Sequence, residues 1–116
     1  MNTQKICIIG DGLAGLSTAL ILSQKNVKID LYVGTNKNYK SKIDNRTTAI
    51  SESSFQFIQK KLSIKKNIFW PCKEIKLFFE EKKIVKNFLN FKEQNKKTMY
   101  VFQNKELKKK LISQIL

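Results

Sequence analysis

The first third of the chain contains three short patterns of apolar and polar positions that predict regular structure. Residues 5–10 are mostly apolar and end at a glycine, as in a strand buried within a parallel sheet. Residues 13–24 place Leu16 and Leu20 on one face at helical spacing, which predicts a helix. Residues 28–33 alternate and are rich in β-forming side chains, which predicts a second strand. Together these patterns predict a βαβ unit with parallel strands and a right-handed crossover.

The middle of the chain predicts a loop followed by a helix. Residues 34–45 are polar and are expected to form the loop, whereas residues 48–62 are expected to be helical. Ser51 or Ser53 would cap the start of this helix. The apolar contacts expected from it are Ile50, Phe55, Phe57, Ile58 and Leu62.

The following residues predict a set of strands. Pro71 is expected to break the chain and to place Cys72 in a loop. Strand-like runs at residues 74–81, 84–91 and 98–103 then indicate additional antiparallel strands.

A last helix is expected over residues 105–116, with Asn104 as its N-cap. Its apolar stripe consists of Leu107, Leu111, Ile112 and Ile115. Because no later segment covers this stripe, we expect residues 1–116 to be the N-terminal portion of an incomplete α/β domain, with no second domain.

Length and composition fit a single domain. The chain has 116 residues, of which 41% are hydrophobic and 28% are charged, so it can bury a core. No apolar run approaches the ~20 residues that span a bilayer. Residues 1–4 lead directly into a strand-like run. We therefore expect neither a transmembrane helix nor a secretory signal.

The chain is strongly basic, with 23 Lys and Arg residues against 9 Asp and Glu and a net charge of +14. Arg46 is the only arginine, and the lysines are scattered singly or in pairs, with one triplet at residues 108–110. Proteins that read nucleic acids usually use arginine, so no nucleic-acid partner is expected. We interpret the charge as a solvated basic surface, with weak attraction to anionic lipid or nucleic acid as the alternative.

Several classes of active site are excluded by residue content. The chain has no histidine and only two cysteines, Cys7 and Cys72, which form no C-x-x-C pair. The usual zinc sites and any Ser-His or Cys-His catalytic pair are therefore ruled out. Free thiols are typical of a reducing, cytoplasmic compartment.

The most informative motif is the glycine turn, residues 10–15, which reads G-x-G-x-x-G between a predicted strand and a predicted helix. In a dinucleotide-binding turn, Gly10 permits the tight bend, Gly12 lets the backbone approach a diphosphate, and Gly15 allows close packing. The amides that begin the helix supply hydrogen-bond donors. The alternative is a glycine turn that only packs a helix on a sheet. The motif alone does not choose between FAD and NAD(P).

An acidic residue normally follows the second strand of such a unit and binds the ribose hydroxyls. In this chain Val33 occupies that position, and Asp30 lies three residues earlier. Asp30 would face the ligand only in a different strand register, and an exposed strand position is the alternative. The ribose contact therefore has no assigned residue.

A second motif is carried by residues 44–51, Asp-Asn-Arg-Thr-Thr-Ala-Ile-Ser. It resembles the Asp-x-Arg-x-x-Ala-Leu-Ser segment of flavin-dependent aromatic hydroxylases, and within them most resembles the ubiquinone-biosynthesis, octaprenyl-phenol hydroxylase group. Residues 69–75 and 100–107 are similar to two later elements of that family, in the same order.

This resemblance implies a para-hydroxybenzoate-hydroxylase-like fold, with a Rossmann-like βαβ unit, that binds FAD. The diphosphate would lie on Gly10, Gly12 and Gly15, with Leu13 and Ala14 in the same turn. Arg46 would lie along the cofactor, and Gln103 would contact it as well. Arg46 is the only arginine in a lysine-rich chain. This supports a role at position 46 that needs the planar, forked guanidinium group and that a lysine would not fill. A surface pair of Arg46 with Asp44 or Glu52 is the alternative.

The resemblance also implies the reaction of the complete enzyme, a monooxygenase. NAD(P)H would reduce FAD, and oxygen would hydroxylate an aromatic small molecule, a polyprenyl phenol on the ubiquinone pathway. The flavin carries that chemistry, and the protein orients it. We expect a cytoplasmic protein with peripheral contact at the inner membrane face and other ubiquinone-biosynthesis proteins as partners. The family's second flavin motif is absent, so we expect weak FAD binding and no turnover.

Two other classes of function remain open at this stage. An NAD(P)-binding domain of a dehydrogenase or reductase would explain the glycine turn but not residues 44–51. A non-enzymatic basic module would bind nucleic acid or membrane with a steep dependence on salt.

Overall fold

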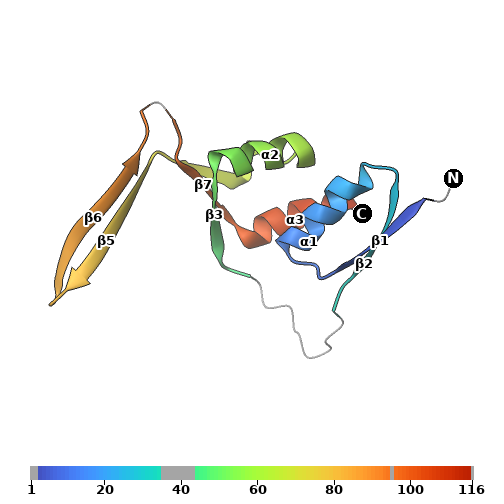
Figure 1. Cartoon of the computed structure of the whole chain (residues 1–116), viewed down its shortest axis with the longest axis horizontal. Coiled ribbons are helices and arrows are strands. Elements are labelled where there is room, and N and C mark those ends of the chain that lie inside the picture. Colours follow the sequence, from blue (N-terminus) through green and yellow to red (C-terminus); the bar gives the residue numbers. More distant parts are fainter. Residues whose placement is uncertain (1–2, 35–43, 95, 116) are drawn as a thin grey trace.

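The computed structural model describes residues 3–34, 44–94 and 96–115, and it shows a mixed α/β chain with three helices and several small sheets (Figure 1). Part of the loop expected over residues 34–45 and the last residue of the expected final helix lie outside these described residues.

The N-terminal unit consists of β1 (Gln4–Ile9), α1 (Leu13–Ser23) and β2 (Val27–Tyr32). The two strands pair in parallel from Gln4 opposite Val27 to Ile9 opposite Tyr32. The predicted order of strand, helix and parallel strand is therefore confirmed. Helix α1 buries Leu16, Ala19 and Leu20, which are the residues that its helical spacing placed on one face.

The expectation that β1 is a buried strand is wrong. No described residue of β1 is buried, Cys7 is exposed, and Ile9 is 86% exposed. Successive side chains of a strand point to opposite faces, and α1 packs on only one face of this two-stranded sheet. Ile6 and Ile8 are half-buried as a result, whereas Cys7 and Ile9 face away.

A second sheet has the order β3–β7–β4, and all its pairs are antiparallel. Its strands are β3 (Thr47–Ser51), β4 (Phe69–Cys72) and β7 (Met99–Gln103). The predicted helix over 48–62 therefore begins too early, because its first residues pair with β7 as a strand. Cys72 lies in β4 and not in a loop. Pro71 is accommodated because β4 is an edge strand, where a missing N–H faces no partner.

Helix α2 (Glu52–Leu62) begins at the predicted cap. The Ser51 hydroxyl accepts a hydrogen bond from the Ser54 amide at 3.2 Å, and the helix ends at Ser63 in the left-handed conformation. Phe55 and Leu62 are buried as expected, whereas Phe57 is half exposed and makes no core contact. A single 3₁₀ turn at Lys66–Ile68 leads into β4.

Strands β5 (Glu74–Glu81) and β6 (Ile84–Lys92) form a hairpin that projects from the rest of the molecule (Figure 1). The antiparallel set expected from the sequence is confirmed for this pair only. Strand β7 pairs with β3 and β4 instead of extending the hairpin. The hairpin register shifts between Leu77 and Phe78, where an extra residue of β6 forms a bulge.

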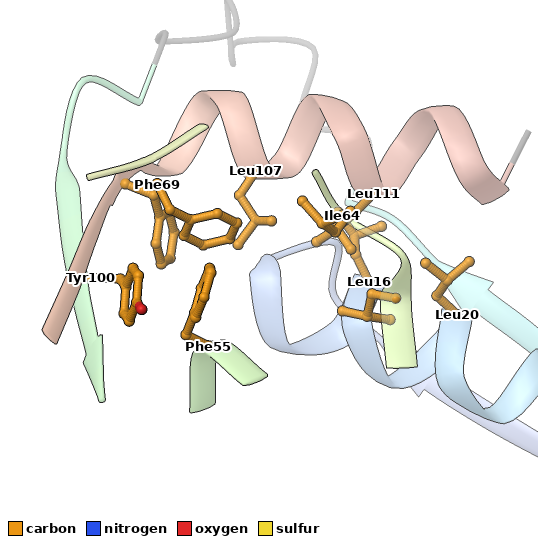
Figure 2. Close-up of a cluster of buried hydrophobic side chains, with 10 residues drawn as sticks. Leu16, Leu20, Phe55, Ile64, Phe69, Tyr100, Leu107 and Leu111 are labelled. Carbon is orange, nitrogen blue, oxygen red and sulfur yellow. The ribbon is translucent and has the colours of Figure 1, made fainter. Parts of the chain in front are cut away.

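Helix α3 (Asn104–Ile115) packs against α1 and closes the core. Phe55 stacks on Tyr100 with ring centroids 3.7 Å apart, and Phe69 meets Phe55 edge to face (Figure 2). The buried cluster comprises Leu16, Leu20, Phe55, Leu62, Ile64, Phe69, Tyr100, Phe102, Leu107 and Leu111. Among the described helices, none is long and apolar enough to cross a membrane.

Candidate functional site

The first glycine of the turn makes the bend that follows β1. Gly10 has a φ of +110°, a conformation that side chains with a Cβ rarely adopt. Its amide donates a hydrogen bond to the carbonyl of Tyr32 at 2.9 Å. This bond extends the pairing of β1 with β2 by one residue and directs the chain out of the sheet toward α1.

The third glycine allows α1 to approach that bend. A Cβ placed on Gly15 would overlap the carbonyl oxygen of Gly10 and would also touch the side chain of Ile8. The first turn of α1 therefore lies directly against the end of β1. Gly15 is required for packing, whether or not a ligand is bound.

The second glycine has no such structural reason. Gly12 is the N-cap of α1 with φ −71° and ψ 176°, an extended conformation that any residue adopts. A Cβ on Gly12 would meet nothing within 4 Å. The fold leaves an open space at this position, as close approach of a ligand to the backbone requires.

The start of α1 also carries the features of an anion site. No side chain among the described residues caps this helix, and no acidic residue lies in its first turn. The amides of Leu13 and Ala14 belong to the first turn, where helix amides lack intrahelical partners and carry positive partial charge. This end of α1 therefore fits a diphosphate beside Gly12.

A basic side chain from the last helix reaches the glycine turn. The Lys108 ammonium donates to the Oδ2 atom of Asp11 at 3.3 Å, and both side chains are about two-fifths exposed. Asp11 lies between the first two glycines of the turn. Lys108 thus compensates a negative charge at the place where the glycine turn would hold a phosphate group.

Arg46 lies immediately before β3 and binds Asp44 in a bidentate manner. Its Nε and Nη2 atoms donate to the two carboxylate oxygens of Asp44, each at 2.9 Å, and its amide donates to Oδ1 at 3.0 Å. The Arg46 side chain is 81% exposed. The side-chain hydrogen bonds from Arg46 hold the pKa of Asp44 far below its ordinary value, so Asp44 stays ionised.

Asn104 joins this pair to the start of α3. Its backbone N–H donates to the backbone carbonyl of Arg46 at 3.0 Å, and its side-chain Nδ2 donates to the Asp44 carboxylate at 3.3 Å. Its side-chain oxygen accepts from the Thr48 hydroxyl. Asn104 is the one buried polar residue among the described residues. The network fixes the segment that holds Arg46 against α3.

Gln103 ends β7 opposite Thr47, which is the first residue of β3. The structure therefore brings Gln103 and Arg46 to the same end of the β3–β7 pair. Lys108 lies one helical turn beyond Asn104 and contacts the glycine turn. The start of α3 thus connects the two predicted groups, the glycine turn and the pair Arg46 and Gln103.

Three contributors to this arrangement were not among the predicted site residues: Asp44, Asn104 and Lys108. Asp44 belonged to the motif at residues 44–51, and Asn104 was identified only as a helix cap. No local signal separates Lys108 from the neighbouring lysines of its triplet, because its contact with Asp11 is made across 97 residues.

The ribose position remains without an assigned residue. Asp30 forms an ion pair with Lys5 at 2.9 Å, and this hydrogen bond lowers the pKa of Asp30. Val33 is half exposed after the end of β2. This geometry fits the alternative in which Asp30 is a strand residue without a ligand role. Its partner is the side chain of Lys5 on the neighbouring strand.

Three hollows on the described surface lie away from the glycine turn. One of about 500 Å³ lies along the end of α2, and one of about 190 Å³ lies between α1, β2 and the end of α3. The third, of about 520 Å³, lies at the base of the hairpin.

Comparison with known proteins gives a likeness of fold. No family model matches the chain, and no curated protein sequence does so. Among solved structures, the 2,6-dihydroxypyridine-3-hydroxylase from Arthrobacter nicotinovorans superposes with a TM-score of 0.64 at 13% sequence identity. The match covers 95% of this chain and 26% of the hydroxylase, so the chain spans about a quarter of that protein's length. At this identity the match shows a shared fold.

Proposed function

We propose that the chain is the N-terminal FAD-binding part of a flavin-dependent monooxygenase that hydroxylates an aromatic ring. Three independent observations support the proposal. The fold is shared with a hydroxylase of a dihydroxypyridine over 95% of this chain. Residues 44–51 resemble a segment of flavin-dependent aromatic hydroxylases. The glycine turn follows a strand and opens a helix, as a dinucleotide site requires.

The observation that carries the proposal is the environment of Gly12. Gly10 and Gly15 are explained by backbone conformation and packing, so they would be needed in any protein with this turn. Gly12 is not explained in either way, because its conformation is ordinary and the space around it is open. A ligand that approaches the backbone at this point would account for a glycine here.

The proposed cofactor contacts follow from the same geometry. The diphosphate would bind the glycine turn at Gly10, Gly12 and Gly15 and accept hydrogen bonds from the amides of Leu13 and Ala14. Two further contacts at the end of the β3–β7 pair are proposed for Arg46 and Gln103. Bound FAD would supply the redox chemistry of ring hydroxylation. The protein's part is to orient the flavin and to balance the phosphate charge.

Arg46 can take part without leaving Asp44. The two hydrogen bonds from its side chain use two of the five N–H donors of a guanidinium group. Its large exposure leaves the remaining donors accessible. Asp44 and Asn104 act as positioning residues in this proposal, because they fix the orientation of the guanidinium group.

The proposed reductant, substrate and partners of the complete enzyme rest on the sequence resemblance. We propose NAD(P)H as the reductant, a polyprenyl phenol of ubiquinone biosynthesis as the aromatic substrate, and other ubiquinone-biosynthesis proteins as partners. The proposed place of action is the cytoplasmic face of the inner membrane. Because the chain spans 26% of the matched hydroxylase, hydroxylation is proposed only for a protein that also supplies the remaining regions of that fold.

Binding of FAD to the purified chain tests the proposal. Titration of FAD, followed by flavin fluorescence, should show saturable binding that Gly12→Val abolishes. Thr18→Val is the matched control, because it places the same side chain at an exposed site on the same helix. Equal binding by both variants would contradict the proposed site. Binding of NADH or NADPH without FAD would instead favour a nicotinamide-dependent dehydrogenase or reductase.

A further inference from the structure

The register of β1 and β2 determines which residue lies beside the glycine turn. The last paired residues of the two strands are Ile9 and Tyr32. The next residues along these parallel strands, Gly10 and Val33, therefore lie opposite one another. The Gly10 amide donates to the Tyr32 carbonyl at 2.9 Å, which continues the register into the turn. Val33 thus occupies the position directly after the second strand of the βαβ unit, next to the first glycine.

Alternation along β2 places Val33 and Asp30 on opposite sides of the sheet. Leu31 lines a hollow together with Leu20 of α1, so Leu31 faces that helix. Because successive side chains of a strand point to opposite faces, residue 33 continues on the α1 side. Asp30 points to the other side, where it binds the Lys5 ammonium at 2.9 Å. Asp30 is therefore directed away from the helix whose start would hold the diphosphate.

The carboxylates in the first part of the chain are all paired with cations. The sequence has three acidic residues before position 52, and each forms an ion pair. The pairs are Asp11 with Lys108, Asp30 with Lys5, and Asp44 with Arg46. Residues 31–43 contain no aspartate or glutamate. A ribose beside Val33 would therefore meet no unpaired carboxylate from this part of the chain.

The residue after the second strand normally reads the 2′ position of the adenosine ribose. A carboxylate there accepts a hydrogen bond from the ribose 2′-hydroxyl, and it repels a 2′-phosphate because two anions would lie close together. Val33 can do neither, since its side chain has no charge and no atom that forms hydrogen bonds. Residue 33 is therefore the specificity-determining position, and valine removes both effects together.

We propose that the glycine turn accepts the adenosine diphosphate part of a dinucleotide with or without a phosphate on its ribose 2′ oxygen. This inference rests on the proposed dinucleotide site at Gly12 and adds the class of nucleotide that the site admits. The site selects its ligand through the diphosphate and not through the ribose. A 2′-phosphorylated nicotinamide dinucleotide would accordingly compete with FAD for the turn.

The charge around the turn is compatible with an additional phosphate. Lys108 compensates the carboxylate of Asp11 at 3.3 Å. The first turn of α1 contains no acidic residue, and its amides carry partial positive charge. The whole chain has a net charge of +14. A 2′-phosphate beside Val33 would therefore meet no net repulsion from this chain.

The features that carry this inference lie within the chain. The pairing of β1 with β2, the alternation along β2 and the identity of residue 33 do not depend on whether further regions of a complete protein cover this edge of the sheet. The exposed fraction of Val33 is not needed for it.

Calorimetric titration with two matched nucleotides tests the inference on the wild-type chain. ADP-ribose and ADP-ribose 2′-phosphate share the adenosine and the diphosphate and differ only at the ribose 2′ oxygen. Their dissociation constants should differ by less than about fivefold at roughly 0.15 M salt, where attraction of anions to the basic surface is screened. Each should also displace FAD. A larger preference in either direction would overturn the inference.

Two variants at position 33 locate the contact. Val33→Glu should tighten ADP-ribose and weaken its 2′-phosphate, because the carboxylate accepts from the hydroxyl and repels the phosphate. Val33→Gln is the matched control, since it has nearly the same shape without the charge. The ratio of the two dissociation constants should differ between these variants by at least about tenfold. A smaller difference would show that residue 33 does not face the ribose. Circular dichroism checks that both variants are folded, and the wild-type titration needs neither.

Failure of this inference can be told from failure of the proposed function. FAD binding together with rejection of the 2′-phosphate would overturn the inference alone. FAD binding that ADP-ribose does not displace would do the same, because the adenosine half would then lie elsewhere. No binding of FAD or of either probe would overturn both. Binding of both probes without FAD would support the inference and contradict FAD as the cofactor.

Discussion

The Lys108 ammonium lies 3.3 Å from the Asp11 carboxylate, which ties the second turn of α3 to the turn between β1 and α1. The contact joins two segments that are 97 residues apart in sequence. It places a positive charge where the proposed diphosphate would otherwise meet the uncompensated charge of Asp11. The last helix therefore takes part in the proposed site as well as in the core.

The first prediction concerns this lysine. Lys108→Ala should weaken FAD binding by roughly two- to fivefold at low ionic strength, because partly exposed ion pairs contribute about 0.2–1 kcal/mol. The loss should shrink as salt is added. Titrations at two salt concentrations measure it, and Lys109→Ala, which removes an exposed lysine from the same helix, is the control. Identical affinities for the two variants would show that the Asp11 pair has no role in binding.

The second prediction separates the packing role of Gly15 from the ligand role of Gly12. Gly15→Ala forces a Cβ against the Gly10 carbonyl, so it should destabilise the fold by about 1–3 kcal/mol. Gly12→Ala meets open space in an allowed conformation and should change stability by no more than about 1 kcal/mol. Thermal and urea unfolding of both variants measure the difference. Equal destabilisation would mean that Gly12 also has a packing role.

The third prediction tests the network around Asn104. Asn104→Ala removes the side chain that binds Asp44 and Thr48 in a buried position, so it should cost about 1–3 kcal/mol of unfolding free energy. Asn90→Ala on the exposed hairpin is the matched control and should have almost no effect. Urea unfolding compares the two. A neutral Asn104→Ala would show that the backbone bond to Arg46 suffices to hold this segment.

The fourth prediction concerns alkaline pH. Burial raises the pKa of the Tyr100 hydroxyl to about 12, and the neighbouring Glu52 carboxylate adds to the shift. The Oε2 atom of Glu52 is buried and has no hydrogen-bond partner among the described residues, so the carboxylate acts on the pKa of Tyr100 as a nearby negative charge.

Because the pKa of Tyr100 is higher in the folded chain, the unfolded chain loses this proton first as pH rises. The stability that Tyr100 contributes is complete below about pH 10 and is lost between about pH 10 and 12. Unfolding free energies across this window should fall more steeply for the wild type than for Tyr100→Phe. Parallel curves for the two proteins would show that Tyr100 does not titrate with unfolding.

The sequence predicts the parts of the fold that local signals determine. A short apolar run, a glycine turn and helical spacing lie consecutively in the first third of the chain, and the structure has the corresponding strand, helix and parallel strand. Ser51 as the cap of α2 was also a local signal, and its hydroxyl caps that helix. Asn104 was expected to cap the last helix, but it is the first residue of α3, and its side chain bonds Thr48 and Asp44 instead. Of the three glycines in the predicted turn, Gly10 and Gly15 have structural roles, whereas the ligand role of Gly12 stays a prediction.

The errors arise where distant residues decide the structure. Thr47–Ser51 directly precedes a helix and becomes a strand only because β7, about fifty residues later, pairs with it. Pro71 was expected to break the chain, yet a proline is tolerated on an edge strand, and only the sheet order shows that β4 is one. The contact of Lys108 with Asp11 likewise depends on the position of α3 and leaves no local pattern. The pairing of Arg46 with Asp44, by contrast, joins residues two positions apart and was one of the alternatives that the sequence offered.

The order of strands in the second sheet has a consequence for how the chain folds while the ribosome synthesises it. Strand β7 lies between β3 and β4 but follows both in the chain. The β1–α1–β2 unit can pair while synthesis continues, whereas β3 and β4 must wait for β7. Pairing β3 with β7 closes a long loop, which costs conformational entropy and is slow. Premature release or pausing before residue 99 would therefore leave two unpaired strands and the aromatic core exposed to aggregation.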